Sequence, residues 1–523
     1  MSRLEIASPK RAKIVMEGLY KDLERRIESS PPGLCPVDMA RAFLELCHAQ
    51  TCGKCVPCRI GLGQLNNFIR EVLDGKATMK TLDIMEQTAL SIMESADCAI
   101  GYEAANMVYK GLIGYRDDYI EHIQNGRCTC TYNQPVPCVS LCPAHVDIPG
   151  YIALVGEGRY ADAIRLLRKD NPFPTTCGFI CEHPCEARCR RNMVDDSINI
   201  RGLKRVAADF AGEVDPPQCA PSTGKKIAIL GGGPGGLSAA YYLQLMGHQT
   251  TVYEMLPELG GMLRYGIPNY RLPKERLDDD IRAILKTGVQ VKNGLKIGQD
   301  ITIQELRQQY DVVLITIGAS TDKKLGLENE DADGIISAVQ FLRNVGKNQI
   351  IDLTGKEVVV IGGGNVSMDA VRTAKRLGAK KVSIVYRRRV ADMTALPGEI
   401  EGAVAEGIEL QTLKAPASID VDENHHVKGI YVTPQMVSSI RDGRASIKPT
   451  GEEDIYIPCD VLIVAIGQNI ETHHFEQAGI PVERGKIITK STGAFENLPG
   501  VFAGGDCASG PASVIKAIAA AKV

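Results

Sequence analysis

Cysteines are the densest group of chemically useful residues in this sequence. Of the 17 cysteines, 15 lie before residue 220 and two follow it. Thiolates bind iron and zinc, and in a reducing compartment such crowding indicates metal sites rather than disulfides. We therefore expect a cytoplasmic protein whose first part holds metal.

Three of these cysteines stand close together in the string Cys52-Gly-Lys-Cys55-Val-Pro-Cys58, and Cys98 follows after a helical stretch. A C-x2-C-x2-C run with a remote fourth cysteine suits a 4Fe-4S cluster, which needs converging thiolates. Zinc is the alternative for such spacing. Iron is favoured because the later sequence carries two redox nucleotide motifs.

A second group holds enough thiols for two more 4Fe-4S clusters, whose ligands need not follow sequence order. Its members are Cys128, Cys130, Cys138, Cys142, Cys177, Cys181, Cys185 and Cys189. The sequence thus predicts three 4Fe-4S clusters. The other cysteines are expected to be ordinary small packing residues or surface thiols.

A glycine loop opens the second half of the chain. Gly231, Gly233 and Gly236 form G-x-G-x-x-G between an apolar strand and a helix. Glycine lets the backbone approach a pyrophosphate, which the helix N-terminus stabilises. Glu254 ends the next strand, where a carboxylate accepts hydrogen bonds from ribose hydroxyls.

The same motif recurs later with a different strand end. Gly362 and Gly364 keep the first two glycines, and Ser367 replaces the third. In place of Glu254, the following strand runs into Arg387-Arg388-Arg389. Guanidinium groups bind a 2′-phosphate that a carboxylate would repel, so we expect NADP(H) here rather than NAD(H). A solvated surface cluster is the alternative for these arginines.

No Cys-x4-Cys pair follows the first glycine loop, because residues 260–268 contain no cysteine. A flavoenzyme that exchanges electrons through a dithiol is therefore not expected. Electrons must leave the flavin by another route.

The elements that must position these residues change along the chain. Residues 1–125 and 126–218 are expected to be mainly helical, since apolar residues recur at helical spacing. After a turn-rich linker, short β-branched runs alternate with glycine loops and helices, and this pattern occurs twice. The expected fold class is α/β, with two Rossmann-like domains preceded by two helical iron-sulfur domains.

Composition excludes several function classes. With 60 basic and 63 acidic residues, the chain has no overall field to recruit nucleic acid. We find no apolar run of about 18 residues for membrane insertion. The first residues lack the apolar core of a signal peptide, which again favours the cytoplasm.

Residues from about 126 to 523 resemble the small subunit of glutamate synthase, the N-terminal portions of dihydropyrimidine dehydrogenase, and the large subunit of NADH-dependent reduced ferredoxin:NADP oxidoreductase. The strings that carry this resemblance are Cys142-Pro143, Asp147-Ile-Pro-Gly-Tyr151, Cys181-Glu-His-Pro-Cys185-Glu-Ala-Arg-Cys189, Gly362-Gly-Gly-Asn-Val-Ser-Met-Asp369, Tyr386-Arg-Arg388 and Gly504-Gly-Asp506. The resemblance implies an FAD domain over 224–350 and 480–523, with an NADP(H) domain over 351–479 inserted into it.

The resemblance also implies roles for single residues. Gly505 and Asp506 would lie near the ribityl and pyrophosphate of FAD, and Glu399 would be a catalytic neighbour of the nicotinamide. The other cofactor-binding candidates are Gly235, Gly261, Gly318, Asn365, Val366 and Gly467.

Two departures from the family concern the metal ligands. By the family's pattern, one cluster would take Cys128, Cys130, Cys138 and Cys189, and the other Cys142, Cys181 and Cys185. The spacing from Cys128 to Cys138 differs from that of relatives, so that loop must be rebuilt. Lys204 stands where some relatives have a Gln or Glu ligand, and a protonated lysine has no lone pair. Cys177 is the expected replacement.

Residues from about 35 to 120 look like the C-terminal iron-sulfur domain of the NADH-binding flavoprotein subunit of respiratory complex I, through residues 51–59 and Cys98. The FMN and NADH domain of that flavoprotein is missing from this chain. We expect a partner subunit to supply it.

These features predict a subunit of a hetero-oligomeric oxidoreductase that passes electrons among NADP(H), FAD and the clusters, as in an electron-bifurcating transhydrogenase. The expected partners are an FMN/NADH-binding subunit, a small iron-sulfur subunit and ferredoxin. Alternatives are a glutamate synthase small subunit, an electron-transfer subunit of a hydrogenase or formate dehydrogenase, and a non-catalytic electron-wiring scaffold.

Overall fold

The computed structural model describes residues 15–21, 23, 35–126, 136–187, 189–193, 195–349, 351–441 and 444–522. The chain divides into two compact units. The first unit comprises Met1–His145 with His183–Ile200, and the second comprises Val146–Glu182 with Arg201–Val523.

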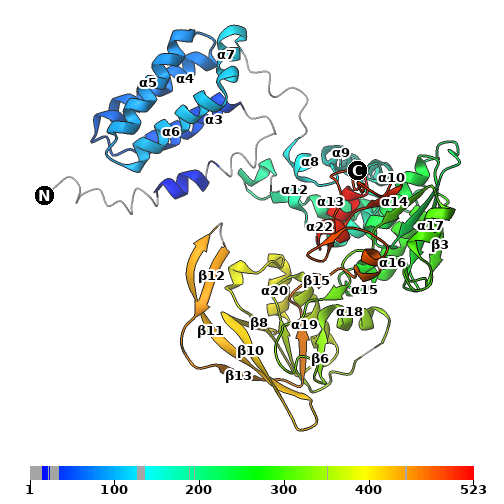
Figure 1. Cartoon of the computed structure of the whole chain (residues 1–523). Helices are drawn as coiled ribbons and strands as arrows, with labels where there is room; N and C mark the ends of the chain where they lie inside the picture. The colour runs from blue at the N-terminus through cyan, green and yellow to red at the C-terminus, as the bar shows by residue number, and fades with distance from the viewer. Residues whose placement is uncertain are drawn as a thin grey trace. The chain divides into compact units, whose positions relative to one another are not determined.

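The first unit is helical, and Figure 1 shows α3 to α6 as neighbouring helices. Its elements are α3 (Pro36–Ala49), η1 (Pro57–Gly61), α4 (Leu62–Leu73), α5 (Met79–Ser95), α6 (Ala99–Gly114), α7 (Arg116–Asn125), α8 (Pro137–Leu141), α12 (Pro184–Ala187) and η2 (Arg190–Met193). Apolar residues at helical spacing, such as Leu62, Leu65 and Ile69 of α4, are buried in a shared core. This core places the cysteines at helix ends.

The second unit begins with short helices that lead to its first sheet. These helices are α9 (Ile148–Gly156), α10 (Tyr160–Arg168), α11 (Pro174–Ile180) and α13 (Ile200–Phe210). Asp147 caps α9, since its side chain accepts a hydrogen bond from the Gly150 N–H at 3.0 Å.

The first sheet is parallel, with strand order β18-β4-β1-β2-β3. Its strands are β1 (Lys226–Leu230), β2 (Gln249–Glu254), β3 (Gln290–Asn293), β4 (Val312–Ile315) and β18 (Val501–Ala503). The helices in these segments are α14 (Pro234–Leu245), α15 (Met262–Tyr265), α16 (Lys274–Leu285), α17 (Ile303–Gln309), α22 (Asp506–Ser509) and α23 (Val514–Ala520). Because β18 comes from the end of the chain, the intervening strands form an insertion.

The second sheet is also parallel and has the order β6-β14-β7-β8-β9. Its strands are β6 (Ile335–Ser337), β7 (Glu357–Ile361), β8 (Lys381–Tyr386), β9 (Glu409–Thr412) and β14 (Val461–Val464). The accompanying helices are α18 (Ala338–Gly346), α19 (Asn365–Arg376), η3 (Val390–Asp392) and α20 (Pro397–Ala405). Helix α21 (His473–Gln477) instead packs into the core of the first sheet through Phe475. In this sheet β14 pairs with β7, just as β4 pairs with β1 in the first sheet. Strand β6 also belongs to this sheet, although its residues precede residue 351, where the NADP(H) domain was expected to begin.

Antiparallel strands complete the second unit (Figure 1). They are β10 (Lys414–Val421), β11 (Val427–Arg441), β12 (Arg444–Pro449) and β13 (Ile455–Pro458), with β11 pairing to the other three. Two small ladders join β5 (Thr321–Asp322) to β15 (Gln468–Asn469) and β16 (Val482–Glu483) to β17 (Lys486–Ile487). Among the described residues, no helix is both long and apolar enough to cross a bilayer.

Candidate functional site

The first glycine loop is shaped so that side chains cannot enter it. Gly231 has φ +113°, and a Cβ there would lie 2.5 Å from the carbonyl oxygen of Thr316. A Cβ on Gly236 would lie 2.0 Å from the carbonyl oxygen of Gly231. Helix α14 begins directly after Gly233. Its unpaired N–H groups are therefore open to an anion, as a dinucleotide pyrophosphate requires.

Glu254 holds this loop in place from the end of β2. One carboxylate oxygen accepts the Gly232 N–H at 2.7 Å, and the other accepts the Leu256 N–H at 2.8 Å. Burial raises the pKa of Glu254, while these two backbone hydrogen bonds act in the opposite direction. A carboxylate has about four acceptor positions, so capacity remains for the ribose hydroxyls expected from the sequence.

A second loop packs on the first. Gly261 has φ +52°, and a Cβ on it would lie 2.8 Å from the Cα of Gly233. Gly235, in the first turn of α14, faces the carbonyl oxygen of Ala517 on α23. The first glycine loop and the late helix α23 thus meet at this point.

Three further candidates lie where the strands of the first sheet end. Gly318 and Gly505 have φ values of +67° and +72°, and no described atom lies within 4 Å of where their Cβ atoms would stand. Asp506 follows Gly505 at the start of α22, and burial raises its pKa. Together with the glycine loop, these open positions fit an extended dinucleotide such as FAD.

The second glycine loop borders a cavity of about 820 Å³. Gly362, Gly364, Asn365 and Val366 line it on the loop side. A Cβ on Gly362 would lie 2.3 Å from the carbonyl oxygen of Ala465. The cavity has the size expected of a cofactor site.

The three consecutive arginines have three different environments. Arg387 is exposed, Arg388 donates a 3.0 Å hydrogen bond to the Ala445 carbonyl, and both line the cavity together with Gly467. Arg389 instead donates to both carboxylate oxygens of Asp392, at 2.8 and 3.0 Å. Two guanidinium groups are therefore available at the strand end where a 2′-phosphate would bind.

Sequence reasoning missed two residues that line this cavity, Glu182 and Lys516. The Glu182 carboxylate accepts a 3.3 Å hydrogen bond from the Asn365 amide, whose oxygen accepts the Leu396 N–H at 2.9 Å. The position of Glu182 beside the predicted ligand Cys181 could have drawn attention to it. Nothing in the sequence singles out Lys516.

Glu399 forms ion pairs with two arginines. Its carboxylate lies between Arg271 Nε at 3.1 Å and an Arg372 guanidinium nitrogen at 2.7 Å. The described residues that line the cavity do not include Glu399. Its ion pairs thus hold it between two arginines, and its predicted role beside the nicotinamide stays a prediction.

The four thiols of the first predicted cluster converge in the helical unit. Cys98 occupies the N-cap of α6, and Cys58 lies in η1, directly before α4. Burial, together with the thiols of Cys55, Cys98 and Cys52, raises the pKa of Cys58 to about 12. A Cβ on Gly101 would lie 2.6 Å from the Cys58 sulfur.

Four converging thiols suit a 4Fe-4S cluster. A single zinc ion is the alternative for such a ligand set.

The second cysteine group is divided between the two units. Cys138, Cys142, Cys185 and Cys189 belong to the first unit, in which α8 packs against α12. Burial and the thiols of Cys189 and Cys142 raise the pKa of Cys138. Cys128 and Cys130 lie outside the described residues.

Cys177 and Cys181 belong to the second unit, at the middle and end of α11. Two effects raise the pKa of Cys177 well above its usual value. The larger is a hydrogen bond to Cys181, and the second is burial. The buried ammonium of Lys204 lies near Cys177 and shifts its pKa the other way. The predicted replacement ligand and the residue it would replace are thus neighbours.

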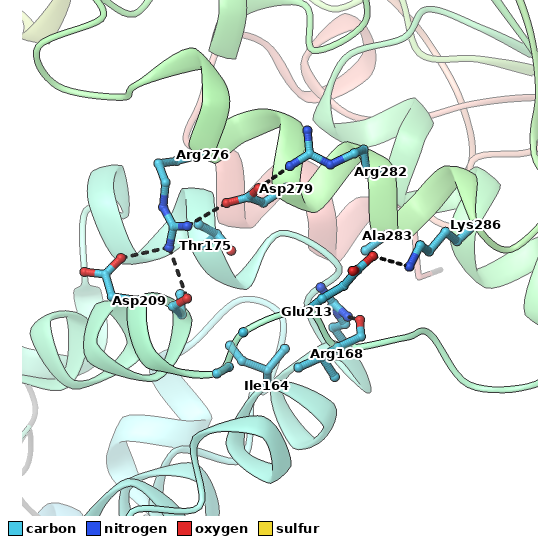
Figure 2. Close-up of a pocket in the computed structure, with 14 residues that line it drawn as sticks. Ile164, Arg168, Thr175, Asp209, Glu213, Arg276, Asp279, Arg282, Ala283 and Lys286 are labelled. Atoms are coloured by element: carbon cyan, nitrogen blue, oxygen red, sulfur yellow. Dashed lines mark hydrogen bonds and ion pairs between the residues drawn. The ribbon is translucent and has the colours of Figure 1, made fainter.

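A second cavity, of about 310 Å³, lies along α10, the end of α13 and α16 (Figure 2). Ion pairs line it, including Arg276 with Asp209 at 2.8 Å and Arg276 with Asp279 at 2.6 Å. None of the predicted cofactor or metal residues borders this cavity. Most of its charged side chains form ion pairs, whereas Arg168 donates to the Val214 carbonyl and its Nε has no hydrogen-bond partner among the described residues.

Three protein families match successive parts of the chain. Residues 225–521 match the pyridine nucleotide-disulphide oxidoreductase family. Residues 38–122 match the NADH-ubiquinone oxidoreductase-F iron-sulfur binding region, and residues 114–215 match the 4Fe-4S domain II of dihydropyrimidine dehydrogenase. These matches confirm the predicted FAD/NAD(P) and 4Fe-4S regions and the family resemblance.

Curated relatives match most of the chain. The NADP(+)-dependent formate dehydrogenase subunit beta of Moorella thermoacetica is 32% identical, over 92% of this chain and 77% of that protein. The NADPH-Fe(3+) oxidoreductase subunit beta of Geobacter sulfurreducens is 34% identical, over 93% and 77%. The small chain of NADPH-dependent glutamate synthase of Escherichia coli is 34% identical, over 73% and 85%.

A solved structure supports the predicted fold class. A mutant of FprA from Mycobacterium tuberculosis superposes with a TM-score of 0.50 and 21% sequence identity. It covers 58% of this chain and 84% of the FprA chain. Two parallel sheets with glycine loops, preceded by helical iron-sulfur regions, are thus the architecture predicted from the sequence.

Proposed function

Because this chain belongs to the pyridine nucleotide-disulphide oxidoreductase family, we propose that it moves a hydride between NADP(H) and FAD and single electrons between FAD and 4Fe-4S clusters. FAD, when bound, can exchange two electrons with one partner and one with another. The chain is an oxidoreductase of the class formed by beta subunits and small chains of multi-subunit enzymes. Residues of this chain must bind both nucleotides, orient them for hydride transfer and exclude water from the reaction.

The observation that carries this proposal is the cavity beside the second glycine loop. Arg387 and Arg388 line it at the end of β8, while Glu254 occupies the equivalent strand end of the first domain. Cationic groups at one site and a carboxylate at the other support two different dinucleotides. NADP(H) would take the arginine side, and FAD would take the Glu254 side.

The one-electron part of the proposal rests on the thiols. We propose three 4Fe-4S clusters, the first held by Cys52, Cys55, Cys58 and Cys98. The other eight predicted thiols would hold the remaining two, with Cys177 as the ligand in place of Lys204. The burial of Cys177 beside Cys181 supports this last assignment.

The finer proposal concerns the complex. We propose a cytoplasmic, electron-bifurcating assembly in which an FMN/NADH subunit, a small iron-sulfur subunit and ferredoxin are the partners. The matched iron-sulfur region over 38–122 supports docking to a flavoprotein subunit. The many thiols support a reducing compartment.

A second candidate function is the electron-transfer subunit of an NADP-dependent formate dehydrogenase. It is favoured by the Moorella relative, which matches 92% of this chain, including the N-terminal iron-sulfur region. The glutamate synthase chain matches only 73%. The first 4Fe-4S region therefore weighs against a glutamate synthase role.

The test is to purify the native complex without oxygen, identify its subunits and add NADPH. We expect flavin absorbance that bleaches with NADPH and an FMN-containing partner subunit. A formate dehydrogenase catalytic subunit would select the second candidate. A glutamate synthase large subunit would overturn both, and protein without flavin absorbance would indicate a non-catalytic scaffold.

A further inference from the structure

A buried arginine links the two nucleotide-binding domains. Arg271 follows α15 of the first domain and donates to both carboxylate oxygens of Asp369 on α19, at 2.9 and 2.7 Å. Its Nε lies 3.1 Å from a carboxylate oxygen of Glu399 on α20. The Arg271 side chain is 12% exposed and that of Asp369 is 5% exposed. One guanidinium thus serves two carboxylates of the other domain.

The contact continues as a network across the domain boundary. Arg372 joins Glu399 to Glu406, at 2.7 and 2.8 Å. Tyr270, next to Arg271, lies under two guanidinium groups, with Arg376 at 3.9 Å and Arg372 at 5.0 Å from its ring centre. Cation–π contacts and ion pairs are strongest when they are desolvated. Arg372 is 15% exposed, whereas Arg376 is 41% exposed.

In the sequence, elements that carry this network begin next to residues of both glycine loops. On one side, α15 begins at Gly261, which packs against Gly233 of the first loop. On the other side, α19 begins directly after Gly364 of the second loop and carries Asp369. A rotation of one domain against the other would break the bonds of Arg271 to Asp369 and Glu399.

We infer that Arg271, through Asp369 and Glu399, fixes the orientation of the NADP(H) domain against the FAD domain for hydride transfer. This inference rests on the proposed function, and it makes Arg271 a positioning residue. Hydride transfer needs the reacting atoms about 3–3.5 Å apart, and a displacement of about 1 Å can cost roughly 100-fold in rate. Through its ion pair with Arg271, Glu399 contributes to the same orientation.

The test compares R271Q with a matched control, R264Q. Arg264 is 9% exposed and pairs with Glu258 and Asp278, both within the first domain. The holoprotein is mixed anaerobically with NADPH, and two signals are followed: flavin bleaching and the long-wavelength charge-transfer absorbance of a nicotinamide stacked on the flavin. We expect R271Q to lose the charge-transfer band and about 10- to 100-fold in bleaching rate, with unchanged FAD content and NADPH affinity.

The control and a conservative variant separate positioning from general destabilisation. R264Q should keep the band and the rate, although it loses the ion pairs of a buried arginine. R271K should recover part of both signals, because it restores the charge but not the fork that reaches two carboxylates. The inference is overturned if R271Q reacts as the unmodified protein does, or if R264Q shows the same losses.

Hydrogen exchange of the holoprotein without NADPH tests the inference independently. In R271Q, amides of residues 266–273 and of α19 should exchange faster, and in R264Q those of α19 should not. If the unmodified protein is not reduced by NADPH, the proposed function fails, and this exchange measurement still decides the domain link. Unchanged exchange in R271Q would overturn the link.

Discussion

The three consecutive arginines show that residue type alone does not decide which side chains line a binding site. Arg387, Arg388 and Arg389 have the same chemistry in the sequence, and any of them could meet a 2′-phosphate. In the structure, Asp392 takes Arg389, which leaves the other two on the cavity wall. The Asp392 carboxylate thus binds Arg389 and leaves Arg387 and Arg388 beside the cavity. The string of three arginines does not indicate this difference.

The preference for NADPH over NADH should depend on Arg387 and Arg388 and not on Arg389. Replacing Arg387 and Arg388 with Gln should raise the KM for NADPH by at least about 100-fold, since two charge-assisted bonds, each worth about 1.5–3 kcal/mol, are lost. The KM for NADH should change little. Steady-state reduction of a dye by both nucleotides measures the ratio.

R389Q is the control for that experiment, because Arg389 is hydrogen-bonded to Asp392 and does not line the cavity. It should lower stability without altering the preference. Equal ratios for the double variant and the unmodified protein would contradict the assignment of the second site to NADP(H).

Gly101 is a residue whose importance no motif indicates. A Cβ on it would stand 2.6 Å from the Cys58 sulfur, a distance that side chains do not tolerate. We expect G101A to lose about four iron atoms per chain, those of the first cluster, while NADPH still bleaches the flavin. Iron analysis and EPR of the reduced protein measure the loss.

Gly114 provides the matched control at the other end of α6. No described atom lies within 4 Å of the position of its Cβ. G114A should therefore keep all its iron. Full iron content in G101A would show that Cys58 does not serve a cluster in this position.

At the scale of elements, α11 depends on a residue far away in the chain. Asp280 of α16 is completely buried, and its two carboxylate oxygens accept the Thr175 and Thr176 N–H groups at 3.3 and 2.7 Å. These donors belong to the first turn of α11, where a helix leaves its N–H groups unpaired. The helix that carries Cys177 is thus capped by the FAD domain.

Removing that cap should destabilise the second unit. We expect D280A to lose about 1–3 kcal/mol of unfolding free energy, because two buried N–H groups lose their acceptor. D280N keeps one acceptor oxygen and should lose less. Thermal unfolding of the two variants, followed by circular dichroism, measures the difference.

The pH dependence of the same carboxyl has a definite sign. Burial raises the pKa of Asp280 to about 6, above the usual value of 3.8. The folded state therefore binds more protons between these two values, and the Asp280 contribution to stability falls as pH rises from about 4 to about 6. The melting temperature of the unmodified protein minus that of D280N should fall across this range. A difference that stays flat would contradict the raised pKa.

Elements with strong local signals were predictable from the sequence. The strands before Gly231 and Gly362 are apolar runs followed by glycine, and both occupy the centres of parallel sheets. The repeated strands at 312–315 and 461–464 take equivalent places beside them. In contrast, β6 depends on pairing with the distant strand β14. The strands β10, β11 and β12 pair with their neighbours in the chain, but they carry no glycine loop that would mark them.

At the scale of the whole molecule, the environment of Glu399 shows why part of the site could not be predicted. The family resemblance places this residue beside a nicotinamide, but its partners Arg271 and Arg372 come from distant segments. Ion pairs across a domain boundary depend on tertiary geometry that no spacing rule encodes. The same holds for Glu182 and Lys516, which reach the cavity from opposite sides of the insertion in the sequence.

The separate cores of the molecule lead to a prediction about its unfolding. Leu65 lies in the helical core of the first unit, whereas Ile384 lies in the core of the second sheet, and both are fully buried. Because each core is built from its own segments, we expect two transitions in calorimetry rather than one. L65A should lower one transition and I384A the other, each by about 2–5 kcal/mol of unfolding free energy. A single transition that both variants lower equally would mean that the one-electron and two-electron parts of this chain fold as one cooperative unit.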